Sequence, residues 1–447
     1  MDNRQLSACG WLSGLIFHGN GQGWACTSAV AYGVGVVDDR RMTTRRPFGV
    51  QLAGQVWGVA AWDAGGPIVS TAYDGRDLGT MVACAVDLAG KVLWQQRFHG
   101  HPFPPRLSAD RTAWIAHRGA VGMEVSQLDS AGTTVGTVRL DSHPSEALGA
   151  FVVLPNGFMV LWTPAEQGQH ARLARHDTEG STRWSVPLPL RNITIPGSVT
   201  INQRTGEVRP MPPRAPRGLV KAGRPTALLV SGSRAAATVA CDDSGIAVTF
   251  FVDTDTGRVV ATTAPGPIFE KAIAGRGEFL IGFQGYGAFR TARYDAAGTL
   301  TQEWPTHAHM LVDAKGVISG VESQNNYSTQ YFVRFGTDGT VQRGAELSGY
   351  YTAYPAVDKH GTAVFWRDGF LLAVAADLEM RQLHELDDNR VILSRVLLLL
   401  EEGHVAYAAS DELIIYREPE LGTLNDGIWP CANGGLQGNP VASFPPT

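Results

Sequence analysis

Several functional signatures are missing from this 447-residue sequence. Its five cysteines are scattered, with no CxxC pair and no histidine at zinc-site spacing. No apolar run reaches 18 residues, which predicts that no helix spans a membrane. Only five lysines stand against 32 arginines, and the net charge is −5. The chain therefore has no overall positive field that would attract nucleic acid.

Nucleotide and metal motifs are also missing. There is no GxxxxGK and no GxSxG, and the glycines of GNGQG at 19–23 do not form a dinucleotide fingerprint. His99 with His101, and His307 with His309, have a spacing that places both rings on one strand face. Neither pair has an assignable third ligand, so we expect no metal site and no cofactor.

Turn residues, in contrast, are abundant, with 52 glycines and 25 prolines. In AVDLAGKVLW, residues 85–94, two apolar runs flank a turn that begins at Asp87 and contains Gly90. Such a pattern is typical of a β-hairpin. The same turn position recurs at 129, 177, 253, 295, 336 and 377, in steps of 42, 48, 76, 42, 41 and 41 residues. This period predicts a β-propeller with one four-stranded blade per repeat.

A second set of turns, about 20 residues before each of these positions, leaves room for two more strands per repeat. One blade then reads VWGVAAW, PIVSTAY, MVACAVD and KVLWQQR, in up-and-down order. We expect an all-β, single closed propeller over residues 1–447. Eight blades between Gln51 and Trp429 are favoured, with N-terminal strands helping to close the ring. Nine remain possible if residues 10–48 form another.

One repeat contains an insertion. Residues 189–224 contain most of RPMPPRAPRGLVKAGRP, residues 209–225, which has five prolines, five basic residues and no apolar periodicity. Because proline removes backbone donors and stiffens the chain, we expect a projecting Pro/Arg-rich loop here. The preceding INQRTGEVRP is compatible with an extra hairpin.

The blade pattern resembles the quinoprotein-like propeller superfamily, the folds related to pyrroloquinoline quinone dehydrogenases. The resemblance lies in AVDLAGKVLW, HDTEGSTRW and YDAAGTLTQEW, which end at Trp94, Trp184 and Trp304, and in WPCANGGLQGN from Trp429. Enzymatic members carry adjacent cysteines, a carboxylate base beside calcium and, in some, CxxCH. This chain has no Cys-Cys pair and no CxxCH, so no catalytic residue can be carried over. The resemblance implies a non-catalytic bacterial scaffold that holds a protein partner.

Ligand recognition is expected where the inner strands begin, at the mouth of the central channel. The candidate residues there are Trp57, Arg106, Arg224, Glu270, Lys271, His309, Tyr351, Tyr354 and Arg395. Aromatic and arginine side chains suit a protein or glycan surface. The alternative is an enzyme, a lyase or hydrolase acting on a carbohydrate or metabolite. It would use Glu270 with Lys271 or His309 as acid and base at the channel mouth.

The termini leave localisation open. LSAC, residues 6–9, resembles a lipoprotein cleavage box, but no apolar core precedes it. The resemblance favours a periplasmic or extracellular location, and a native N-terminus at Met1 would favour the cytoplasm. Ring closure should bring Cys431 close to the segment with Cys9 and Cys26, and should place Trp429 in the outer strand of the last blade.

Overall fold

The recurring aspartates form the turns that the sequence indicates. Asp87 Oδ1 accepts hydrogen bonds from the N–H groups of Ala89 and Lys91, at 3.0 and 2.8 Å. Gly90 adopts φ +85°, a conformation that glycine takes without steric cost. Asp129, Asp177 and Asp295 accept the same pair of bonds. Each of these turns joins two antiparallel strands, so the sequence repeat corresponds to a repeated hairpin.

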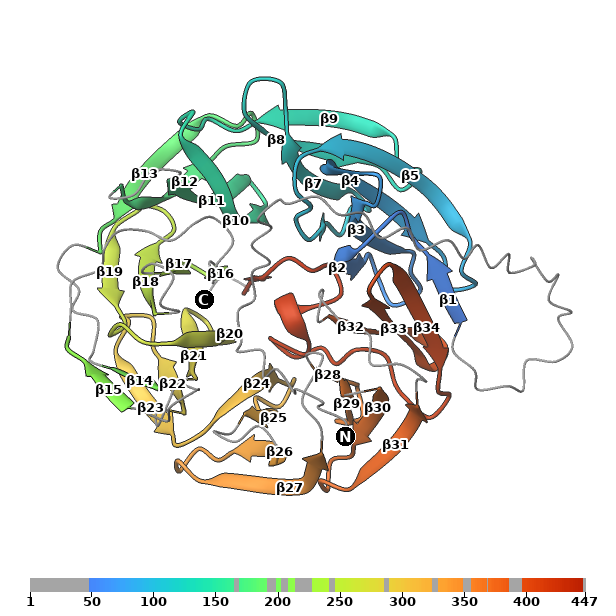
Figure 1. Ribbon diagram of the computed structural model, residues 1–447, viewed down its shortest axis with the longest axis vertical. Helices are drawn as coiled ribbons and strands as arrows, with labels where there is room; N and C mark the ends of the chain where they lie inside the picture. Colours follow the sequence, from blue (N-terminus) through green and yellow to red (C-terminus); the bar gives the residue numbers. More distant parts are fainter. Residues whose placement is uncertain are drawn as a thin grey trace, which may run out of the picture. The chain divides into compact units, whose positions relative to one another are not determined.

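The computed structural model describes residues 48–164, 169–190, 198–201, 208–213, 227–240, 246–284, 289–323, 329–348, 355–367, 369–385 and 396–444. All of them belong to the unit formed by residues 45–447. Eight sheets, each built on four up-and-down strands, are arranged as blades around a ring (Figure 1). The chain is therefore an eight-bladed β-propeller, and the nine-blade alternative is not realised.

The first four blades have the following strands. Blade 1 contains β2 (Val56–Ala61), β3 (Ile68–Asp74), β4 (Asp77–Val86) and β5 (Val92–His99). Blade 2 contains β6 (Arg106–Leu107), β7 (Ala113–Arg118), β8 (Met123–Leu128) and β9 (Thr134–Arg139). Blade 3 contains β10 (Glu146–Leu154), β11 (Gly157–Pro164), β12 (Ala171–His176) and β13 (Thr182–Leu188). Blade 4 contains β16 (Ala227–Ser231), β17 (Arg234–Ala240), β18 (Ala247–Asp253) and β19 (Val259–Thr262).

The other four blades follow the same order. Blade 5 contains β20 (Ile268–Gly275), β21 (Glu278–Phe283), β22 (Arg290–Tyr294) and β23 (Leu300–Trp304). Blade 6 contains β24 (His307–Val312), β25 (Ile318–Ser323), β26 (Thr329–Phe335) and β27 (Val341–Ser348). Blade 7 contains β28 (Ala356–Val357), β29 (Ala363–Arg367), β30 (Phe370–Val374) and β31 (Met380–Glu385). Blade 8 contains β32 (Leu397–Leu399), β33 (His404–Ala409), β34 (Glu412–Arg417) and β1 (Phe48–Gln51), with η1 (Glu401–Gly403) between β32 and β33.

The ring closes through blade 8, which combines strands from both ends of the chain. Its outer strand β1 pairs antiparallel with β34, with Val50 opposite Leu413. The expectation that N-terminal residues help close the ring is confirmed. The expectation that Trp429 lies in the outer strand is wrong, because β1 occupies that edge.

Residues 423–444, here called the C-terminal strap, instead run along the inner strands. The strap includes η2 (Ala432–Gly434) and β35 (Val441–Ala442), which pairs parallel with β16. Its hydrogen bonds reach blades 7 and 8 through Val357 and Leu399, blade 6 through Val312, and blades 1 to 4 through Ala61, Leu107, Val153 and Val230. Arg276, which follows β20 of blade 5, stacks over the strap's Phe444. The strap thus contacts all eight blades at the C-terminal ends of their inner strands.

Tryptophans on outer strands connect neighbouring blades at the same face. Trp94 Nε1 donates to Ser130 O of blade 2 at 3.2 Å. Trp304 Nε1 donates to Gly336 O of blade 6 at 2.8 Å. Trp184 Nε1 donates to Thr254 O of blade 4 at 3.1 Å. Each indole therefore binds the turn carbonyl of the following blade.

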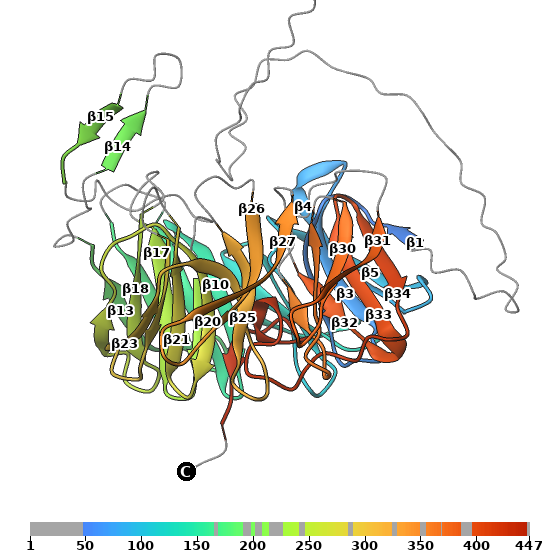
Figure 2. The same cartoon turned by 90° about the horizontal axis from the view of Figure 1, so that it is seen from below.

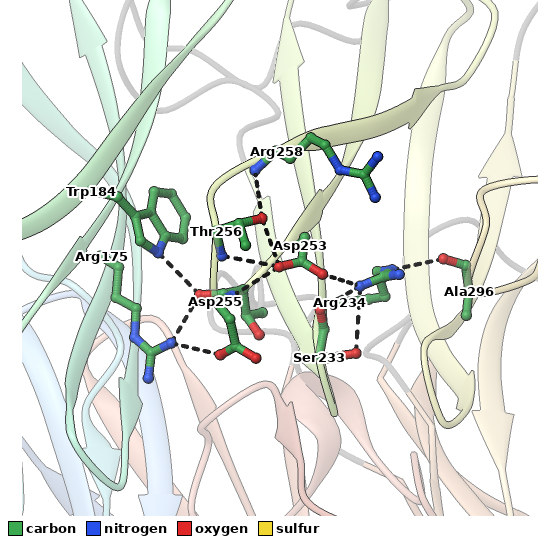
Figure 3. A network of polar contacts seen from close by, with 10 residues as sticks. Arg175, Trp184, Ser233, Arg234, Asp253, Asp255, Thr256, Arg258 and Ala296 are labelled. Carbon is green, nitrogen blue, oxygen red and sulfur yellow. Dashed lines mark hydrogen bonds and ion pairs between the residues drawn. The ribbon is translucent and has the colours of Figure 1, made fainter.

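Charged groups extend the contact around Trp184 across three blades (Figure 3). Arg175 of blade 3 donates to Thr254 O at 2.9 Å, beside the indole. Arg234 of blade 4 forms an ion pair with Asp253 at 2.6 Å and donates to Ala296 O of blade 5 at 2.8 Å. One turn of blade 4 is thus held from both sides.

The inserted segment contains the extra hairpin. β14 (Ser198–Ile201) pairs antiparallel with β15 (Val208–Met211). Most of the Pro/Arg-rich stretch that follows lies outside the described residues. The description of 189–224 as a projecting loop remains a prediction.

Candidate functional site

The two ends of the inner strands differ. Their C-terminal ends bind the strap, which lies among the inner strands in the middle of the ring (Figure 1). The face with the strap carries the short Asp–Gly turns, and the opposite face carries the starts of the inner strands (Figure 2). The residues predicted for recognition were assigned to these starts. We call this end the channel mouth.

Glu270 and His309 meet at the channel mouth on adjacent inner strands. Each is the third residue of its strand, in β20 and β24 respectively. Glu270 Oε1 and His309 Nδ1 are 3.0 Å apart, and the side chains are only 12% and 11% exposed. The register of β20 shifts between Ile268 and Glu270, and such a bulge re-aims the strand here. The sequence-based pairing of Glu270 with His309 is therefore realised in space.

Burial and neighbouring charges act in opposite directions on Glu270. Burial alone raises the pKa of a carboxyl group, but the attraction and hydrogen bond of His309 outweigh it and lower the pKa of Glu270 below its ordinary value. Burial lowers the pKa of Lys271, and the charge of Glu270 only partly opposes this effect. Glu270 is thus held as a carboxylate at neutral pH.

His307 is a further buried group that the sequence offered only as half of a metal pair. Burial lowers its pKa to about 3, so the ring stays neutral. Neither ring nitrogen has a hydrogen-bond partner within the described ranges. Its ring lies 6.3 Å from that of His309, centroid to centroid. In the part of the chain that the structure describes, no group of three His, Cys, Asp or Glu residues could hold a metal ion.

An aromatic cluster occupies the channel mouth at blades 1 and 2. Trp57, the unpaired residue of a bulge in β2, is 41% exposed. Its ring meets that of Tyr73 edge-on at 5.8 Å, and Tyr73 meets the ring of exposed His101 at 5.9 Å. Blades 1 and 5 are four positions apart in a ring of eight. The aromatic cluster therefore lies on the opposite side of the ring from Glu270 and His309.

Arg106 has a different environment from the other candidates. Its side chain is buried, and Nε donates to Phe151 O at 3.2 Å while Nη1 donates to Gly438 O of the strap. Burial lowers its pKa to about 10. This arginine therefore anchors the strap. Arg224, Tyr351, Tyr354 and Arg395 lie outside the described residues.

Two contributors to the site were missed from the sequence. Tyr73 is in the second strand of its blade, and strand position alone does not show that it turns towards Trp57. His101 was noted only with His99, and its contact with Tyr73 depends on the path of the loop between β5 and β6. The bulge at Trp57 has no sequence signature either. The only sequence signal that could have indicated Tyr73 and His101 was that aromatic and histidine side chains occur near predicted strand ends.

The cysteines provide no bridge in the described chain. Cys84 and Cys431 are free and buried. Burial raises the pKa of the Cys431 thiol to about 12. Cys9 and Cys26 lie outside the described residues. No helix among those residues is long and apolar enough to cross a membrane.

No protein-family model matches the chain. No curated protein matches it in sequence. Among solved structures, the Dos1 propeller is similar, with a TM-score of 0.54 and 10% identity over 85% of this chain and 96% of that one. At this identity the likeness shows the propeller fold alone.

Two other similar structures have TM-scores below 0.5 and carry no argument about this chain. Dihydro-heme d1 dehydrogenase NirN in complex with DHE has a TM-score of 0.44 and 13% identity, over 79% of this chain and 76% of that one. Hydrazine synthase of Kuenenia stuttgartiensis has a TM-score of 0.42 and 12% identity, over 86% of this chain and 99% of that one.

Proposed function

We propose that this propeller is a non-catalytic binding scaffold that recognises a protein or glycan ligand at the channel mouth. The observation that carries the proposal is the aromatic cluster of Trp57, Tyr73 and His101, in which Trp57 and His101 are exposed and Tyr73 is half-buried. An exposed tryptophan that packs against a second ring offers a large, rigid contact area, and its side chain loses little conformational entropy on binding. The bulge at Trp57 presents this ring, and bulges commonly re-aim side chains at functional sites.

On the other side of the channel mouth, blades 5 and 6 supply a fixed polar contact. The Glu270 carboxylate and the His309 ring hold each other in position, and partly buried Lys271 lies beside them. A ligand with polar groups on one side and an apolar or sugar face on the other would complement both walls. The C-terminal strap supports the use of this end, because it covers the other ends of the inner strands.

The enzymatic alternative has less support from these residues. General acid–base catalysis needs one group that is protonated and one that is not near the working pH. The low pKa of Glu270 makes it a poor acid at neutral pH. His307 stays neutral and buried. Binding needs neither proton transfer nor a group of intermediate pKa.

The quinoprotein-like type is also part of our proposal, and the tryptophan contacts between blades support it. Trp94, Trp184 and Trp304, which suggested the resemblance, play the same role in three blades. On this basis we propose a bacterial protein that acts in the periplasm or outside the cell.

The test is affinity capture with the immobilised full-length chain, from extracts of the producing cells and on a glycan array. Trp57→Ala should lose the captured ligand, with Kd raised about 30-fold, as expected for an interface hot spot. Leu93→Ala is the matched control, because Leu93 is 45% exposed on the outer strand of the same blade. Equal capture by Trp57→Ala would contradict the proposal. Chemical conversion of the captured ligand would favour the enzymatic alternative.

A further inference from the structure

A groove between blades 6 and 7 opens on the face that carries the strap, away from the channel mouth. It has a volume of ≈ 310 Å³. Lys315 and Lys359 lie on the turns after β24 and β28, and Arg334 and His360 complete its polar rim. Two of the chain's five lysines therefore line one groove, although the protein as a whole has a net charge of −5.

The positive side chains of the groove lack an acidic partner among the residues that the structure describes. Within the described ranges, Lys315, Arg334 and Lys359 form no side-chain hydrogen bond or ion pair. Two arginines of blades 5 and 6 behave differently, since Arg343 pairs with Glu322 at 2.6 Å and Arg293 with Glu278 at 2.5 Å. Unpaired cations that converge on a concave surface raise the local positive potential.

The one carboxylate in the groove lining is already engaged. Asp313 Oδ1 accepts hydrogen bonds from the N–H groups of Lys315 and Val317, both at 2.8 Å. It therefore holds the turn in shape, and only part of the groove's positive charge is offset. The groove therefore offers an anionic ligand three cationic side chains, and its carboxylate, Asp313, is hydrogen-bonded to its own turn.

The interior of the groove is apolar and its rim is open. Phe332, Val357 and Ala363 are buried in the lining, at 2%, 4% and 2% exposure, while Val317 is 37% exposed. A small molecule that binds well is usually enclosed over most of its surface. An open groove instead suits an extended segment that continues beyond it.

We propose that this groove binds an acidic segment of a partner protein, with an apolar side chain seated over Phe332 and Val357. Carboxylates of the segment would face Lys315, Lys359 and Arg334. Charge complementarity argues for this occupant, because the pairing gives each unpaired cation a partner and orients the segment. This surface is separate from the channel mouth, and either proposal can fail without the other.

The probe is a fluorescein-labelled octapeptide of alternating Asp and Leu, titrated with the full-length chain and followed by fluorescence anisotropy. We expect saturable binding that weakens as salt is raised from 50 to 500 mM, since exposed charges are screened. An Asp/Ser octapeptide should bind more weakly, and a Lys/Leu octapeptide should not bind. Lys315→Glu and Lys359→Glu should each raise Kd roughly tenfold, because each reverses one charge at the rim.

Lys91→Glu is the matched control, because Lys91 is an exposed lysine at the Asp87 turn between β4 and β5 of blade 1, one of the Asp–Gly turns of the same face. It changes the net charge equally and should leave Kd unchanged. Melting temperatures of all three variants should match the parent. Absence of binding, an equal loss in Lys91→Glu, or unchanged binding in the groove variants would overturn the proposal. So would preferential binding of single-stranded RNA or anionic lipid vesicles over the Asp/Leu peptide.

Discussion

The two faces of this propeller are built differently. On one face, the C-terminal strap bonds to the inner strands, and Trp94, Trp184 and Trp304 bind turns of neighbouring blades. On the other, at the channel mouth, Trp57 is exposed and Glu270 meets His309. The first face joins blades to one another, whereas the second presents side chains at strand ends.

This difference suggests a division between stability and recognition. A blade cannot bury both of its sheet faces alone, so a ring depends on contacts between blades. Here those contacts include buried groups at one end of the inner strands. The other end is then free to vary in sequence without loss of closure. The groove between blades 6 and 7 is an exception, because it lies on the joined face and still exposes unpaired cations.

The largest expected effect comes from deleting residues 423–447. The deletion removes hydrogen bonds to seven blades and the buried side chains of Trp429 and Cys431. Loss of this apolar burial should destabilise the ring by on the order of 5 kcal/mol or more. Thermal unfolding followed by circular dichroism should show a much lower, less cooperative transition. Deleting 445–447 alone is the control, and a full deletion that melts like the parent would refute a stabilising role for the strap.

A pair of tryptophans compares the two faces directly. Trp429 of the strap is 5% exposed and Trp57 of the channel mouth is 41% exposed. Trp429→Ala should cost about 3–5 kcal/mol, since it leaves a cavity in the core. Trp57→Ala should cost under about 0.5 kcal/mol, as is usual for surface positions. Urea unfolding gives both values, and similar losses for the two variants would contradict the division between the faces.

The channel mouth should also contribute to acid sensitivity through His307. Its folded pKa of about 3 lies below the ordinary 6.5, so the unfolded chain binds a proton that the folded one does not. Stability is then fully present above pH 6.5 and falls as the pH drops towards 3, by about 1.4 kcal/mol per pH unit.

His307→Leu should flatten that slope, as measured by urea unfolding at a series of pH values. His101→Gln, on an exposed loop, controls for the loss of one imidazole. If the unfolding free energy changes with pH equally in the parent and in His307→Leu between pH 6 and 4, the buried neutral ring of His307 does not cause that change.

The sequence was informative where local chemistry repeats. Asp87 and its counterparts mark turns because a carboxylate two residues before an N–H can bind it, and this rule needs no tertiary information. The spacing predicted the blade repeat, whereas the choice of eight blades over nine and the closure by N-terminal strands came from what is typical of propellers. The prediction for Trp429 failed because an outer edge can be filled by either terminus, and the local pattern does not choose between them.

The candidate site was only partly accessible to the same reasoning. Glu270 and His309 could be placed at strand starts, and adjacent inner strands bring such positions together. Arg106 has the same kind of position, yet it binds Gly438, 332 residues away in sequence. The residues next to Arg106 in the sequence give no indication of a contact so distant along the chain. Bulges such as the one at Trp57 also depend on the pairing partner rather than on the residue itself.

The smallest effect concerns one of the hydrogen bonds that link blades 5 and 6, the bond from Trp304 to Gly336. Trp304 and Trp366 are both buried, at 1% and 2% exposure. Trp304 Nε1 donates to Gly336 O of the next blade, whereas Trp366 Nε1 has no partner within the described ranges. Replacing either indole with phenylalanine removes a similar volume, but only Trp304→Phe also removes a hydrogen bond between blades, leaving Gly336 O with Gln302 Nε2 as its donor at 3.2 Å. We therefore expect Trp304→Phe to cost about 1 kcal/mol more than Trp366→Phe in urea unfolding. Equal losses would mean that the tryptophans join the blades by packing alone.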